Sequence, residues 1–145
     1  MNVVREFHTR SADETIAIGR GFRDLLQPGE MIVLRGDLGA GKTTLVKGIA
    51  EGFHAALQED VTSPTFTLVH EYRGPEITLF HIDLYRIDTE RELMTLGIDD
   101  LRSEPHGILL VEWGEKFQQI VQESAAEIRI QRTGETEREI IFEPK

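Results

Sequence analysis

Gly36-Asp37-Leu38-Gly39-Ala40-Gly41-Lys42-Thr43 fits the pattern G-x-x-x-x-G-K-S/T of a phosphate-binding loop. Glycines let such a loop curl so that successive N–H groups point inward at an anion, and the helix that follows adds the positive end of its dipole. The lysine, Lys42, reaches the β- and γ-phosphates, and the hydroxyl of Thr43 can bind Mg²⁺. The motif therefore predicts a nucleotide-binding site.

The residues on either side of the loop supply the strand and the helix that the motif requires. Residues 31–34 are a continuous apolar run, which is typical of a buried parallel strand, and residues 108–111 are a second one. After the loop, apolar residues recur at helical spacing through residues 45–53. Strands that alternate with helices indicate an α/β fold. We therefore predict a P-loop NTPase-like, mixed, mostly parallel β-sheet flanked by helices, with residues 1–145 as a single domain.

The remaining segments predict further elements around this core. Residues 3–8 are expected to form a first strand. A helix is expected to begin at Ser11, which has the spacing of a capping box with Glu14, and to end at Pro28-Gly29. Residues 90–96 predict a short helix closed by the glycine that follows. Two hairpins are expected from these β-rich segments: 66–72 with 77–83, and 128–131 with 140–142.

Composition bounds the functions that the chain can have. It has 145 residues, no cysteine, 16 basic and 26 acidic side chains, and a formal net charge of −10. Without cysteine, disulfides, thiol catalysis and thiolate metal sites are excluded. An acidic surface repels phosphate backbones, so we expect no unaided binding of DNA or RNA. No apolar run approaches the ~20 residues that span a bilayer, and the start lacks the pattern of a signal peptide, so a cytoplasmic protein without a membrane partner is expected.

The nucleotide and the acidic site residues are predicted from neighbouring motifs. GTPases recognise guanine with N-K-x-D, and the only asparagine here is Asn2, so ATP is the expected nucleotide. P-loop enzymes also need an acid at the end of a neighbouring strand to hold Mg²⁺ or its water. Glu112 ends the apolar run 108–111, and Asp83 ends the β-rich segment 77–82. Either acid can hold the metal while the other orients water. The segment 63–65 (Ser-Pro-Thr) lies where switch GTPases have a loop ordered by the γ-phosphate; an ordinary turn before a strand is the alternative.

Four other residues each allow two interpretations. Arg86 can supply charge to a transition state or pair with a nearby acid on the surface. Trp113, the only tryptophan, directly follows Glu112 and either packs in the core or lies at the edge of the active site. His70 and His81 alternate with apolar strand residues, which favours structural histidines over metal ligands.

Four stretches together resemble one family. They are GDLGAGKTT at 36–44, SPTFTLV at 63–69, HIDLYR at 81–86 and VEWGE at 111–115. In this order and at this spacing they resemble the TsaE (YjeE) family, the bacterial ATPases of tRNA threonylcarbamoyladenosine synthesis. The resemblance extends from residues 11–15 to the final hairpin.

The resemblance implies a function, partners and site residues. Family members hydrolyse ATP with Mg²⁺ and act on TsaB and TsaD, which modify adenosine 37 of tRNAs that read ANN codons, so tRNA is reached only through that complex. The implied catalytic residues are Lys42, Asp83, Glu112 and Thr65, and the implied Mg²⁺ ligands are Thr43 and Glu112. The implied nucleotide contacts are Asp37, Leu38, Gly39, Ala40, Gly41, Lys42, Thr43 and Thr44, with Thr9, Ser11 and Arg132 for adenine.

Two other functions share the phosphate loop. A small P-loop kinase would transfer phosphate to a small metabolite. Such kinases close an arginine-rich lid over ATP to exclude water, whereas residues 115–127 contain one lysine and no arginine. The third hypothesis is a module that binds nucleotide without hydrolysing it, and two acids near the phosphates argue against this hypothesis.

Overall fold

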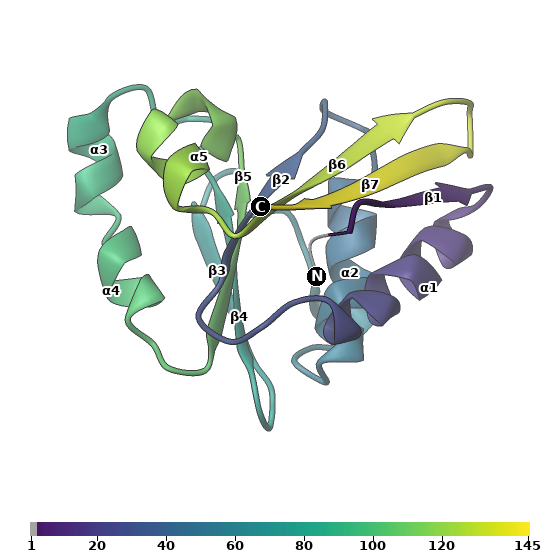
Figure 1. Cartoon of the computed structure of the whole chain (residues 1–145), viewed down its shortest axis with the longest axis horizontal. Helices are drawn as coiled ribbons and strands as arrows, with labels where there is room; N and C mark the ends of the chain where they lie inside the picture. Colours follow the sequence, from purple (N-terminus) through teal and green to yellow (C-terminus); the bar gives the residue numbers. More distant parts are fainter. Residues whose placement is uncertain (1–2) are drawn as a thin grey trace.

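A seven-stranded β-sheet forms the centre of the molecule in the computed structural model, which describes residues 3–145 (Figure 1). The strands are β1 (Arg5–Thr9), β2 (Met31–Arg35), β3 (Val69–Arg73), β4 (Thr78–Asp83), β5 (Gly107–Glu112), β6 (Ala126–Arg132) and β7 (Arg138–Pro144). Their order in the sheet is β1-β7-β6-β2-β5-β4-β3. Neighbours among β6, β2, β5 and β4 pair in parallel, whereas β1, β7 and β3 pair antiparallel. The predicted mixed, mostly parallel sheet is confirmed, and so are both hairpins.

Helices lie on both sides of the sheet (Figure 1). They are α1 (Ala12–Gly21), α2 (Lys42–Gly52), α3 (Glu90–Thr95), α4 (Ile98–Arg102) and α5 (Gln118–Glu123), with 3₁₀ turns η1 (Phe22–Asp24), η2 (Gln58–Asp60) and η3 (Gly114–Lys116). One side carries α1 and α2, and the other carries α3, α4 and α5. No helix in the described part of the chain is long and apolar enough to cross a membrane.

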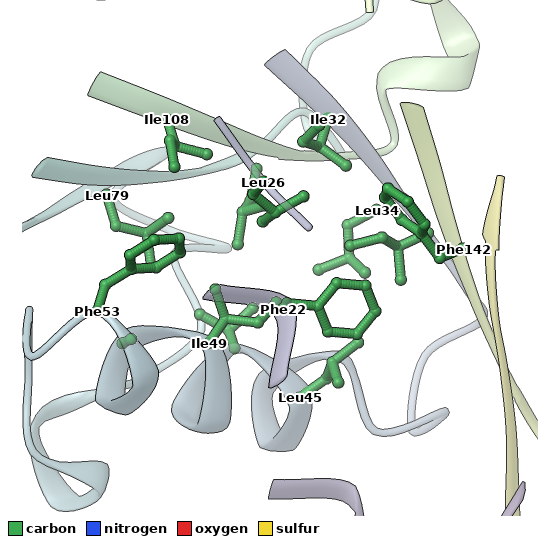
Figure 2. Close-up of a cluster of buried hydrophobic side chains, with 14 of the residues drawn as sticks. Phe22, Leu26, Ile32, Leu34, Leu45, Ile49, Phe53, Leu79, Ile108 and Phe142 are labelled. Atoms are coloured by element: carbon green, nitrogen blue, oxygen red, sulfur yellow. The ribbon is translucent and has the colours of Figure 1, made fainter. Parts of the chain in front are cut away.

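Alternation along the strands divides the core into two clusters. On β2, Ile32 and Leu34 point toward α2, whereas Met31 and Val33 point to the opposite side. Figure 2 shows the first cluster, in which strand side chains meet side chains of α2. The same alternation in β4 and β5 places the side chains of His81, Asp83 and Glu112 on the α2 side of the sheet. Alternation along the strands therefore places these three polar side chains on the side of the sheet that carries α2.

Two glycines allow α1 and α2 to pack closely. A Cβ on Gly48 would lie 2.2 Å from the carbonyl oxygen of Ile16, and a Cβ on Gly19 would lie 2.6 Å from the carbonyl oxygen of Leu45. Real Cβ atoms do not approach backbone oxygens so closely, so both positions require glycine. The contact holds α1, whose N-terminus borders the phosphate loop, against the helix that follows that loop.

Two predicted boundaries are wrong. The strand expected over residues 66–72 begins at Val69, because the preceding residues form a turn in which the N–H of Leu68, with φ of 71°, donates to the carbonyl of Pro64 at 2.7 Å. The first helix, expected to continue to Pro28, ends at Gly21. Beyond it the chain tightens into the 3₁₀ turn η1, whose first residue, Phe22, is buried in the core.

Two smaller differences concern the first strand and the segment after α3. The strand predicted over residues 3–8 is observed as β1, Arg5–Thr9. The glycine after α3, Gly97, closes that helix as predicted, but its left-handed backbone (φ of 71°) also leads directly into a second helix, α4, which was not predicted. The acidic residues Asp99 and Asp100 occupy the first turn of α4 and are exposed, where they interact favourably with the helix dipole.

Candidate nucleotide-binding site

The phosphate-binding loop connects the end of β2 to the start of α2. Gly41 precedes the helix with φ of 106°, a left-handed conformation that favours glycine. The first N–H groups of a helix have no partner within it, so the start of α2, at Lys42, Thr43 and Thr44, presents free donors toward the loop. In the loop, Asp37, Leu38 and Gly39 are exposed, whereas Ala40 is buried. The structure therefore forms the predicted strand, loop and helix of a phosphate site.

The Lys42 ammonium group lies at the centre of this site. The side chain is buried, and its Nζ donates to the carbonyl oxygen of Gly36 at 2.6 Å. Nζ also pairs with Oε1 of Glu112 at 3.2 Å and lies 4.9 Å from the centre of the Trp113 ring. These contacts fix the cation between the phosphate loop and the end of β5.

The two predicted acids lie side by side. Asp83 and Glu112 end adjacent parallel strands at matching register positions, and both are buried. Burial acts to raise the pKa of Glu112, but the hydrogen bond from His81 and the ammonium of Lys42 outweigh it and hold the pKa below the usual value. Glu112 is therefore a buried carboxylate that keeps its charge next to Lys42.

The 63–65 segment contacts the second acid. Oδ2 of Asp83 accepts a hydrogen bond from Oγ1 of Thr65 at 3.0 Å, and Thr65 Oγ1 lies 2.7 Å from Oγ of Ser63. The other oxygen of Asp83 accepts from the N–H of Tyr85 at 2.9 Å. Of the two interpretations of this segment, the geometry favours a loop that belongs to the site, because Thr65 reaches the acid directly.

His81 is a site residue that the sequence reasoning did not assign. Its side chain is fully buried, and Nε2 is hydrogen-bonded to Oε2 of Glu112. The available signal was its spacing, since His81 lies two residues before Asp83 and so shares its side of the sheet. His70, by contrast, bonds to Oγ1 of Thr67 at 2.7 Å, as expected of a structural histidine.

Trp113 and Arg86 lie at the rim of the site. Trp113 is half-buried, has φ of 62°, and packs against the ring of Tyr85 with centroids 5.3 Å apart. It thus lies at the edge of the site, near Lys42, and also packs against the core cluster on the side of the sheet opposite α2. Arg86 has its guanidinium carbon 5.2 Å from the centre of the exposed Phe66 ring, and no ion pair of Arg86 is found within residues 3–145.

The three residues implied for adenine binding do not line one common hollow. A hollow of about 140 Å³ behind the loop is lined by Ser11, Ala12, Thr15, Gly41, Thr44, Glu135, Thr136 and Arg138. Thr9 is buried and hydrogen-bonds to the hydroxyl of Thr15 at 2.7 Å instead of lining this hollow. Arg132 lines a different depression, with residues 35–40 and 129–131. Arg138 and Thr136 line the hollow although the sequence analysis does not single them out, because only the tertiary structure brings the β6–β7 hairpin to the loop.

The donor set fits a magnesium ion bound together with a nucleotide. Within residues 3–145 no group of three or more His, Asp or Glu side chains forms a metal cage. Mg²⁺ at nucleotide sites instead uses one or two protein oxygens, phosphate oxygens and waters. The hydroxyl of Thr43 at the start of α2 and the charged carboxylate of Glu112 are such oxygens.

Comparison with known proteins identifies the family. A sequence model described as "Threonylcarbamoyl adenosine biosynthesis protein TsaE" matches residues 9–140. The Bacillus subtilis protein named tRNA threonylcarbamoyladenosine biosynthesis protein TsaE is 39% identical over 94% of this chain and 84% of its own length. The protein of the same name from Aquifex aeolicus is 36% identical over 91% of this chain and 99% of its own length.

A solved structure agrees with these sequence relatives. The crystal structure of Bacillus subtilis YdiB superimposes with a TM-score of 0.74 at 35% identity, covering 99% of this chain and 87% of that one. The fold class and the family resemblance predicted from sequence are thus confirmed. The chain belongs to the TsaE family, and the relatives that it matches are named as proteins of tRNA threonylcarbamoyladenosine biosynthesis.

Proposed function

We propose that this chain is a cytoplasmic, Mg²⁺-dependent ATPase that acts on TsaD and TsaB in the formation of threonylcarbamoyladenosine at position 37 of tRNAs that read ANN codons. Family membership supports the pathway. The observation that carries the enzymatic part is the meeting of Lys42, Asp83 and Glu112, all buried, at the end of the sheet where α2 begins. With a net charge of −10, the chain is suited to reach tRNA through partner proteins.

Each site residue has a role that follows from its position. Lys42 and the N–H groups at the start of α2 bind the β- and γ-phosphates. Thr43 and Glu112 hold Mg²⁺, which when bound neutralises charge on the phosphate oxygens. Glu112 is preferred for this role over Asp83 because its Oε1 lies 3.2 Å from Nζ of Lys42, which itself donates to the phosphate loop at the carbonyl of Gly36.

Asp83 is then left to orient the attacking water. Its carboxylate is held by two donors, the hydroxyl of Thr65 and the N–H of Tyr85. A carboxylate with a fixed orientation can accept a hydrogen bond from water and direct a lone pair of that water toward the γ-phosphate. Because Thr65 contacts Asp83 directly, a change of the 63–65 loop on binding nucleotide would alter this orientation.

The kinase alternative receives no support from the segment after Glu112. Residues 117 and 120 of that segment are buried in the core cluster on the side of the sheet opposite α2. A segment packed there does not cover the phosphate loop, so it does not form the water-excluding lid that a small-molecule kinase uses. Hydrolysis is therefore the preferred reaction.

The proposal is tested first in cells and then with purified protein. Nucleosides of tRNA are analysed by mass spectrometry in cells depleted of this protein and supplied with the wild type, Lys42→Ala, or the control Lys47→Ala on the same helix. We expect threonylcarbamoyladenosine to be lost on depletion and restored by the wild type and the control alone. Normal modification in depleted cells would overturn the tRNA role, and rescue by Lys42→Ala would overturn the requirement for the phosphate loop.

Phosphate release from ATP by the purified chain, with and without TsaD and TsaB, tests the reaction itself. We expect release that needs Mg²⁺ and is absent in Lys42→Ala, because the ammonium of Lys42 is buried at the phosphate loop, where it can bind the β- and γ-phosphates. Equal release by the wild type and Lys42→Ala would remove the assignment of the site.

A further inference from the structure

A lysine from the segment after β5 holds the connection that follows β4. The Nζ of Lys116, at the end of η3, donates to three backbone carbonyl oxygens: Leu84 at 3.1 Å, Tyr85 at 3.1 Å and Ile87 at 2.6 Å. An ammonium group has three N–H donors, so these three carbonyls match its capacity. The carboxylate of Asp88 lies 3.7 Å away and adds a weak attraction.

This contact joins the two segments that follow the acidic residues. Lys116 follows Glu112 at the end of β5, and the three carbonyls follow Asp83 at the end of β4. Between these two strand ends the backbone makes one further hydrogen bond, from the N–H of Leu84 to the carbonyl of Glu112 at 3.0 Å. The ammonium thus ties together two loops that otherwise share little backbone bonding.

The peptide unit between Leu84 and Tyr85 connects this contact to Asp83. Its carbonyl, that of Leu84, accepts from Lys116 at 3.1 Å, and its N–H, that of Tyr85, donates to Oδ1 of Asp83 at 2.9 Å. The two groups belong to one planar peptide unit, so a shift of the carbonyl is accompanied by a shift of the N–H donor. The other oxygen of Asp83 is bound by the hydroxyl of Thr65, a side chain on a turn, so the Tyr85 N–H is the backbone donor that orients the carboxylate.

We propose that Lys116 is a positioning residue for ATP hydrolysis. Its ammonium fixes the 84–87 connection and, through the peptide unit between Leu84 and Tyr85, the orientation of the Asp83 carboxylate. This inference rests on the proposed ATPase function and on Asp83 as the acid that orients water. Lys116 touches neither nucleotide nor phosphate in this scheme, so its removal lowers turnover and leaves nucleotide binding in place.

The test compares three variants. Lys116→Met keeps the apolar stem and removes all three donors, Lys116→Arg returns N–H donors, and Lys47→Met on α2 is the matched control. In Lys116→Met without nucleotide, we expect hydrogen exchange at the amides of Tyr85 and Ile87 to be faster by about tenfold or more, with α2 unchanged. We expect kcat to fall by about tenfold and the affinity for a fluorescent ATP analogue to change less than about twofold.

Rescue and failure are distinguished by the remaining outcomes. Lys116→Arg should recover slow exchange and most of the turnover, and Lys47→Met should match the wild type. Unchanged exchange at Tyr85 and Ile87 in Lys116→Met overturns the proposal, as does a loss of nucleotide affinity that equals the loss of kcat. A wild type without any hydrolysis refutes the proposed function, whereas an active wild type with an equally active Lys116→Met refutes only the positioning role.

A measurement on the wild type covers the case in which Lys116→Met does not fold. In nuclear magnetic resonance spectra, the Lys116 ammonium should show couplings across its hydrogen bonds to the carbonyl carbons of Leu84, Tyr85 and Ile87. An ammonium group that is hydrogen-bonded only to water gives no such couplings. Their absence for Lys116 would overturn the proposal.

Discussion

Replacing His81 by phenylalanine tests how the fold supports the buried carboxylate. The substitution keeps an aromatic ring at a fully buried position and removes the hydrogen bond to Glu112. A hydrogen bond to a charged group contributes about 1.5–3 kcal/mol, so we expect the free energy of unfolding at pH 7 to fall by about 2 kcal/mol. For a domain of this length, that corresponds to a decrease in Tm of about 4–8 °C.

The effect of this substitution should depend on pH. Burial acts to raise the pKa of Glu112, but the hydrogen bond from His81 and the ammonium of Lys42 hold this pKa below the ordinary value of a glutamate. A carboxyl group with a lowered pKa in the folded state contributes stability that is present above the unfolded pKa and is lost as the pH falls through the folded pKa. The difference between wild type and His81→Phe should therefore be largest near pH 7 and shrink below about pH 4.5.

Urea denaturation at pH 7 and pH 4 measures both effects. The matched control is His8→Phe, because the His8 side chain is 69% exposed and lies 3.9 Å from Glu139. Exposed pairs of this kind contribute about 0–1 kcal/mol, so the control should lose little stability. Equal stability of wild type and His81→Phe at pH 7, or a difference that grows toward pH 4, would refute the reasoning.

Two further predictions concern helix packing and the metal. Gly48→Ala places a Cβ 2.2 Å from the carbonyl oxygen of Ile16, so it should lower the free energy of unfolding, measured by denaturation, by about 1–3 kcal/mol. Gly21→Ala is the control, because a Cβ there meets nothing within 4 Å, and it should not lower this free energy. Similar losses in both variants would contradict the packing account. Glu112→Gln should reduce the Mg²⁺ dependence of nucleotide affinity, measured by titration, whereas Asp83→Asn should lower turnover and keep that dependence. An unaltered Mg²⁺ titration in Glu112→Gln would transfer the metal role to Asp83.

The local structure around the phosphate loop was predicted correctly from the sequence. Glycines with their required conformations, the lysine and the hydroxyl residues lie within a few positions of one another, so the strand, loop and helix at residues 31–53 form as the motif indicates. The positions of Asp83 and Glu112 at strand ends were also predicted, because each carboxylate directly follows a segment with the pattern of a strand, residues 77–82 and 108–111. In a parallel sheet such ends converge on one edge, which is why the two acids meet.

The sequence alone therefore determined the fold class, the phosphate loop and the family, since each depends on residues close together in the chain. The tertiary structure alone decided the strand order and the contacts between distant segments. These contacts are the His81–Glu112 pair, the approach of Arg138 to Gly41, and the hydrogen bonds from Lys116 to three carbonyl oxygens. Such contacts depend on register and on which strands become neighbours, and a one-residue change of register moves every side chain of a strand to the other face. A histidine or lysine has the same local signature whether it faces solvent or a buried partner, and only the folded chain selects the partner.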